Sequence, residues 1–163
     1  MFWKLAIRDA AIVAAAILLW LWLAPLSANS QFGDAIGLLA GLALTLVAYV
    51  LHEWGHALGA MASGSTLHPP HTLKHISLFS FDTGVNTRAQ FAAMSVGGFV
   101  VSAFAVAFAY GWLPQEPFAA RVARGGITIL AAITLFIEVP LLLYGLATNR
   151  IPSVVAVFKP RAA

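Results

Sequence analysis

Four long apolar stretches constrain the fold of this chain more than any other feature of its sequence. They cover residues 10–26, 35–63, 91–113 and 125–148, and an α-helix needs roughly 20 apolar residues to cross a bilayer. Backbone polar groups in a bilayer must bond within the chain, so apolar stretches that span it fold as helices. We therefore expect an all-α integral membrane protein with about four transmembrane helices, forming a single membrane-embedded domain over residues 1–163.

The first stretch follows Lys4 and Arg8, as the apolar part of a secretory signal peptide would. A signal-peptide cleavage site needs small residues, however, and Leu26 is large at the position three before the expected cut. We therefore expect a retained helix.

Lysine and arginine residues predict the orientation in the membrane, because the cytoplasmic side carries the excess of positive charge. If the N-terminus is cytoplasmic, that side carries Lys4, Arg8, Lys74, Arg88, Arg150, Lys159 and Arg161, and the other side carries Arg121 and Arg124. We expect both termini in the cytoplasm and a location in the inner (cell) membrane of a bacterium, with the lipid bilayer as a partner. The chain has no run of basic residues, so no nucleic acid partner is expected.

An H-E-x-x-H motif lies within the second stretch, as His52, Glu53 and His56. Histidines four positions apart share one face of a helix and can hold one metal ion, with the glutamate placed to act as general base on a water. The chain has no cysteine, so a metal site must use imidazoles and carboxylates. Ionisable groups at membrane depth are costly and indicate function. The motif predicts a catalytic Zn²⁺ site; a structural metal, or a polar cluster without metal, is the alternative.

Depth along the helices indicates which residues accompany the motif. Trp54, in its middle, lies ten positions before residue 64, where the second stretch ends, and Glu138 lies eleven before residue 149. At 1.5 Å per residue both are about 15 Å deep. Gly98 and Ser102 lie ten and fourteen positions after residue 88, at a similar level. We predict Glu138 as the third metal ligand, which leaves a fourth position for water.

Each of these residues also has a plainer interpretation. Glu138 could pair with a histidine or stay protonated, and Gly98 and Ser102 could serve only close helix packing. Thr134, one turn before Glu138, could orient a metal ligand through a hydrogen bond or bond its own backbone.

Two of these segments resemble the site-2 protease family of intramembrane zinc metalloproteases. The run Leu51-His52-Glu53-Trp54-Gly55-His56-Ala57-Leu58-Gly59-Ala60 is similar to the first motif of that family, and Gly98-Phe99-Val100-Val101-Ser102 is similar to its second, G-x-x-x-(N/S/G). Residues 76–84 resemble the short strand region between the two motif helices, where the family is thought to receive an extended substrate by strand addition. The resemblance implies a strand-like or hairpin segment between the second and third helices.

The fourth stretch departs from the family, which has an Asp-Gly pair there as its third ligand motif. Here the segment reads Phe136-Ile137-Glu138-Val139-Pro140-Leu141-Leu142-Leu143-Tyr144-Gly145, without an aspartate. Glu138, nearly two turns before Gly145, is the carboxylate available. The absent aspartate bears on activity more than on fold.

The expected function is hydrolysis of a peptide bond in or near a transmembrane segment of a membrane-protein substrate. Glu53 would take a proton from the attacking water and pass it to the leaving amine. Ser102 and Asn86 are candidate donors to the developing oxyanion, and Asp82 is a second candidate ligand close to the substrate groove.

Two other functions remain open at this point. The chain could be a non-catalytic relative that serves as a subunit of a larger membrane complex through partner helices, or a transporter or metal-handling protein. His68, His71 and His75 form another cluster, which could bind a metal or gain charge at mildly acidic pH; a polar loop near the lipid headgroups is the preferred interpretation.

Overall fold

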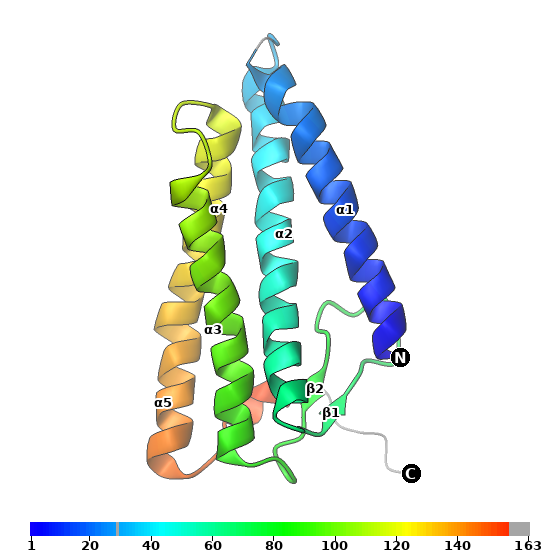
Figure 1. Cartoon of the computed structure of the whole chain (residues 1–163), viewed down its shortest axis with the longest axis vertical. Coiled ribbons are helices and arrows are strands. Elements are labelled where there is room, and N and C mark those ends of the chain that lie inside the picture. Colours follow the sequence, from blue (N-terminus) through cyan, green and yellow to red (C-terminus); the bar gives the residue numbers. More distant parts are fainter. Residues whose placement is uncertain (29, 157–163) are drawn as a thin grey trace.

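A computed structural model describes residues 1–28 and 30–156 (Figure 1). The helices are α1 (Phe2–Ser27), α2 (Gly33–Ala62), α3 (Arg88–Gly111), α4 (Phe118–Ile133) and α5 (Val139–Thr148). The π-helical turn Thr134–Glu138 joins α4 and α5 into one rod, so the described residues contain four helical rods that are long and apolar enough to cross a membrane. The prediction of an all-α membrane fold with four spans is confirmed. Lys159 and Arg161, which were counted in the orientation argument, lie outside the described residues.

All four of these described helical rods begin before the apolar stretches that predicted them, at Phe2, Gly33, Arg88 and Phe118. Outside an apolar stretch, polar side chains can cap the end of a helix and so extend it. The start of α3 shows the cause, because the Thr87 and Gln90 side chains each bond the other's backbone N–H, at 3.3 and 2.8 Å. This capping box satisfies two of the free N–H groups at the helix start.

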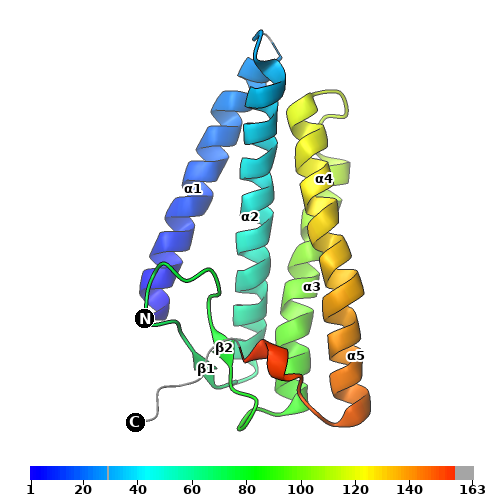
Figure 2. The same ribbon diagram turned by 180° about the vertical axis from the view of Figure 1, so that it is seen from behind.

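The second helix, α2, is central and packs against α1, α3 and α4 (Figures 1 and 2). Its closest approach is to α3, where Gly55 and Gly97 pack backbone to backbone. A Cβ on Gly55 would lie 2.6 Å from the Gly97 carbonyl oxygen, and a Cβ on Gly97 would collide with the Gly55 carbonyl. Small residues allow such contact between membrane helices. As a result, the histidine face of α2 lies directly against the α3 backbone.

A short antiparallel hairpin joins α2 to α3, as the family resemblance implied. Strand β1 (Leu67–His68) pairs with β2 (Ser80–Phe81), with Leu67 opposite Phe81. The Asn86 side chain closes the base of the hairpin, because it accepts from the Thr66 N–H at 2.7 Å and donates to the Thr66 carbonyl at 2.8 Å. The hairpin lies at the same end of the bundle as the N-terminus, which we call the hairpin end (Figure 1).

The hairpin carries an ion pair between His68 and Asp82. The His68 Nε2 lies 2.9 Å from Asp82 Oδ2, and the Gly84 N–H donates to Oδ1 at 2.9 Å. The imidazole bond first, and the Gly84 N–H second, hold the pKa of Asp82 below its ordinary value. A carboxyl group whose pKa is lower in the folded chain than in the unfolded chain stabilises the fold. This stabilisation is fully present at a pH above the unfolded pKa, and it is lost as the pH falls through the folded pKa.

We expect the hairpin to open more often as pH falls below about 4, the ordinary range of an aspartate. Hydrogen exchange of the Asp82 amide, which donates to the Thr66 carbonyl at 3.3 Å, measures this after correction for the intrinsic rate. Asp82→Asn should remove the acid dependence, whereas Asp34→Asn, in the first turn of α2, should keep it. An unchanged acid profile in Asp82→Asn would contradict the assignment.

Candidate metal centre

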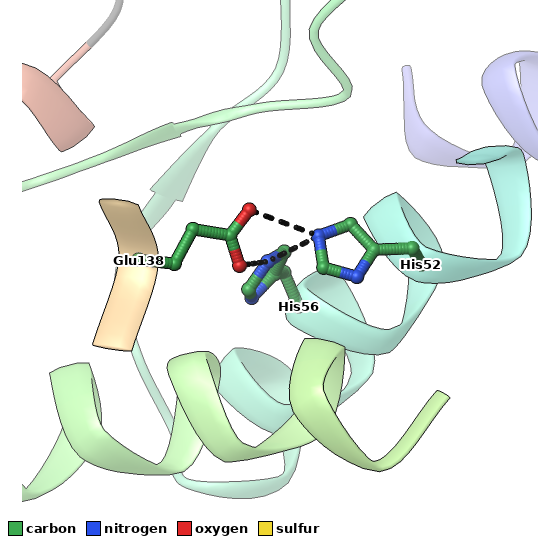
Figure 3. Close-up of side chains that lie close together, drawn as sticks. All are labelled: His52, His56 and Glu138. Carbon is green, nitrogen blue, oxygen red and sulfur yellow. Dashed lines mark hydrogen bonds and ion pairs between the residues drawn. The ribbon is translucent and has the colours of Figure 1, made fainter. Parts of the chain in front are cut away.

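His52, His56 and Glu138 converge between α2 and the rod formed by α4 and α5 (Figure 3). The two histidines are one turn apart on α2, and Glu138 is the last residue of the π-helical turn. His52 is 7% exposed and the other two residues are half-buried. The sequence prediction that brings these three residues together therefore agrees with their positions in the structure.

The distances among the three side chains suit a small tetrahedral cation. The two Nε2 atoms lie 3.0 Å apart, Glu138 Oε1 lies 3.2 Å from His52 Nε2, and Glu138 Oε2 lies 3.4 Å from His56 Nε2. Zinc bonds nitrogen and oxygen at about 2.0–2.2 Å, so two ligands on a tetrahedral ion are about 3.3 Å apart. The observed separations match that edge length.

The outer ring nitrogens fix which atoms face the centre. His52 Nδ1 lies 3.1 Å from the Gly98 carbonyl and 2.8 Å from Ser102 Oγ, and His56 Nδ1 lies 2.9 Å from the Met94 carbonyl. A carbonyl only accepts, so each Nδ1 is assigned as the N–H donor and each neutral ring presents a lone pair at Nε2. Metal-binding histidines are commonly held by such outer hydrogen bonds.

The two Nε2 atoms and the Glu138 carboxylate, all acceptors in this assignment, therefore face one another without a donor between them. Among the described residues, Glu138 Oε2 is the one buried side-chain oxygen or nitrogen without a hydrogen-bond partner. Buried acceptors that face each other repel unless a proton or a cation lies between them. Two imidazoles and a carboxylate are a ligand set that catalytic zinc uses. The residues present thus fit a zinc ion.

The π-helical turn explains how Glu138 reaches the histidines. The Val139 N–H bonds the Thr134 carbonyl, five residues back, in place of the carbonyl four back. The next residue, Pro140, has no N–H, and its ring would crowd the carbonyl of Phe136 in a regular α-helix. The wider turn accommodates the proline and changes the direction of the side chains around it, as π-bulges do at many functional sites.

Gly98 provides the space for the His56 ring. A Cβ at this position would collide with the imidazole, whose Cε1, Nε2 and Nδ1 atoms are its three nearest neighbours. The glycine thus has a specific role beyond general helix packing.

Replacing Gly98 with alanine should displace the His56 ring and weaken zinc binding by more than about 10-fold, since misplacing a held ligand costs 10–100-fold in affinity. Gly111→Ala is the matched control, because a Cβ there meets no atom within 4 Å. Chelator competition monitored by released zinc measures both affinities. Equal affinity in the two variants would show that His56 does not need this space.

Ser102 and Thr134 lie behind His52. Ser102 Oγ is 2.8 Å from His52 Nδ1 and 3.5 Å from Thr134 Oγ1. Thr134 is buried, with 7% of its surface exposed. Ser102 and Thr134 thus link the α3 helix and the π-helical turn to the His52 imidazole. Ser102 orients His52 in this arrangement, and its predicted role as an oxyanion donor gains no support.

Glu53 lies beside the three residues in a cavity of about 300 Å³. The cavity is also lined by Tyr49, one turn earlier on α2, and by His56 and Glu138. Both histidines and Glu138 lie within electrostatic reach of the Glu53 carboxylate. The cavity therefore brings the Glu53 carboxylate together with His56 and Glu138, two of the three converging residues, as the predicted general base requires.

Asp82 and Asn86 take no part in this centre. Asp82 is engaged by His68, and both amide groups of Asn86 bond the Thr66 backbone. Neither residue lines the cavity, so the structure gives no support to Asp82 as a ligand or Asn86 as an oxyanion donor. Within residues 1–28 and 30–156, the triad is the one group of three or more side chains close enough to hold a metal, so the loop histidines form no second site there.

Sequence reasoning missed a contact between α1 and the motif. Asp9 is 4% exposed and accepts from the Trp54 indole N–H at 2.9 Å and from Arg8 Nε at 2.7 Å. Arg8 also donates to the carbonyls of Leu73 and His75. This network holds α1 and the hairpin loop against the motif helix. The sequence does contain a sign of this contact, because Asp9 is the one acidic residue among the first 33, at the start of an apolar stretch where a charge needs a partner.

Comparison with protein-family models, with curated proteins and with solved structures finds no match to this chain. The resemblance to site-2 proteases remains a prediction from the motifs.

Proposed function

We propose that this chain is a zinc-dependent peptidase that hydrolyses a peptide bond in or near a transmembrane segment of another membrane protein. The observation that carries the proposal is the convergence of two Nε2 lone pairs and a carboxylate on one point, beside Glu53 in a cavity. The four apolar helices support a site within the membrane.

A bound zinc ion would supply a Lewis acid and would lower the pKa of a coordinated water to about 7. His52, His56 and Glu138 would hold it. The Glu53 carboxylate would accept a proton from the attacking water and donate it to the leaving amine. The α3 carbonyls of Gly98 and Met94 would keep the two rings oriented through the reaction.

Oxygen isotope transfer provides the direct test. The full chain, loaded with zinc in detergent micelles, is incubated in ¹⁸O-water with a set of synthetic single-span peptides. Hydrolysis places one ¹⁸O atom in each new carboxyl terminus, which mass spectrometry detects. Products that require both zinc and Glu53 support a peptidase. Bound zinc without any product from the whole set would favour the alternative of a non-catalytic subunit.

A further inference from the structure

The chain turns back after α5 and crosses the hairpin end of the bundle. Asn149 ends α5 in the left-handed conformation, with φ 60°, and Pro152 leads into the 3₁₀ turn Ser153–Val155. Figure 2 shows this short red turn leaving the end of α5 and lying between α5 and β2. We call residues 151–156 the C-terminal strap.

The strap forms one wall of the cavity that contains Glu53. Val154 and Val155 line the cavity together with Glu53, His56 and Glu138. Ile151 and Val155 also pack against a buried apolar cluster: Ala60, Phe81, Phe91 and Met94. A segment distant from the motif in sequence therefore lies over the candidate site.

Apolar side-chain contacts hold the strap in place. Among the described residues, its backbone N–H groups donate only within the segment, from Val155 to Pro152 at 3.3 Å and from Ala156 to Ser153 at 3.0 Å. Val154 is 63% exposed although it is apolar. Hydrophobic contact is non-directional, so another apolar segment can make the same contacts. The strap is thus replaceable in a way that a hydrogen-bonded strand is not.

The other walls of the cavity match an apolar ligand. Phe79, Phe91, Met94 and Leu141 line the cavity around the polar groups of the centre. Such a site, mostly apolar with a few converging polar groups, is typical of a ligand pocket. The strap itself shows which ligand the walls accept, since its Val155 packs against the cluster that contains Phe91 and Met94.

We propose that this cavity is a binding site for a short apolar peptide segment, and that the C-terminal strap occupies its mouth until such a segment displaces it. That the displacing segment is a substrate rests on the proposed function. The binding site and its occupation by the strap do not depend on zinc or on hydrolysis. A tethered segment has an effective concentration in the millimolar range, so a free peptide binds best when the strap is weakened.

The chain has no cysteine, so a single introduced thiol can report on the cavity. Ser95 lines the cavity and is 4% exposed. In a Ser95→Cys background, Val154→Ser with Val155→Ser should raise the rate of modification by a small methanethiosulfonate reagent at least 10-fold. Asn149→Val is an independent variant, because a β-branched residue disfavours positive φ, and it should raise the rate without changing the strap residues. An unchanged rate in both would overturn the proposal.

Matched controls separate strap displacement from general loosening. Val85→Ser makes the same substitution at an exposed valine outside the cavity and should leave the Ser95→Cys rate unchanged. Thr72→Cys places the thiol in an exposed loop, where the strap substitutions should not alter the rate. A rise in either control would show that the fold had loosened, and would count against the strap as the barrier.

The peptide itself completes the test. The end-blocked hexapeptide Ile-Pro-Ser-Val-Val-Ala, added at millimolar concentration to the double-serine strap variant, should lower the thiol modification rate at least fivefold. The same peptide with both valines replaced by serine should not. If the double-serine strap variant were modified faster at Ser95→Cys but neither peptide slowed the reaction, the proposal of a peptide-binding site would be overturned. A protein that fails to bind zinc or to hydrolyse peptides would still give these rates, so the two failures are distinguishable.

Discussion

Replacing His56 with alanine is expected to leave the purified protein without stoichiometric zinc. His56 Nε2 lies 3.0 Å from His52 Nε2 and 3.4 Å from Glu138 Oε2, so it forms one corner of the triangle of candidate ligands. Loss of a hydrogen bond to a metal ligand costs about 10–100-fold in affinity, and loss of a ligand should exceed about 100-fold. Elemental analysis of the wild-type and variant proteins, purified in parallel, measures the zinc content.

The control for this variant is His68→Ala. It removes an imidazole from the hairpin, where the ring is paired with Asp82, and it should retain one zinc per chain. Glu138→Ala should behave as His56→Ala does. If His56→Ala kept full zinc while His68→Ala lost it, the metal site would lie in the hairpin loop and the triad assignment would be wrong.

Replacing Glu53 with glutamine is expected to slow hydrolysis by about 10²–10⁴-fold and to preserve the metal. Glu53 shares the cavity with His56 and Glu138 but is not one of the three converging residues. The amide keeps the size of the carboxylate but cannot accept a proton, and loss of general acid–base catalysis costs about 10²–10⁴-fold in rate. The ¹⁸O assay measures turnover, and elemental analysis of the same sample measures zinc.

Glu116→Gln is the matched substitution, because Glu116 is exposed in the turn at the opposite end of the bundle. It should leave both zinc and turnover unchanged. Turnover in Glu53→Gln equal to that of Glu116→Gln would remove the general base from the mechanism.

The helices and the histidine pair could be predicted from local sequence alone. Long apolar runs must satisfy their backbone internally, which dictates helices whatever their neighbours are. The spacing of His52 and His56 places both on one face of any α-helix. Helical rods also have a fixed rise, so counting from the ends of the apolar stretches placed Glu138 at the level of the two histidines, where the structure has it.

The direction of each side chain around its helix could not be counted in this way. Glu138 faces the histidines because the turn before Pro140 is π-helical, and the regular period used for the count does not include that widening. Gly98 accommodates His56 only because Gly55 and Gly97 bring α2 and α3 into contact. The direction of Glu138 and the space at Gly98 both depend on how separate helices pack against one another.

The roles predicted for Asp82 and Asn86 gain no support from the structure, for a related reason. Asp82 and Asn86 lie in a loop whose path is set by pairing with His68 and Thr66, and such pairing is not encoded by local periodicity. The contact of Asp9 with Trp54 and the position of the strap over the cavity join segments far apart in the chain.

The sequence by itself therefore determined the apolar helices, the motif and the matching level of Glu138 along its helix, because backbone hydrogen bonding in a bilayer and helical rise act locally. Only the tertiary structure decided the rotation of Glu138, the space for His56 and the wall over Glu53, because these depend on contacts between separate segments.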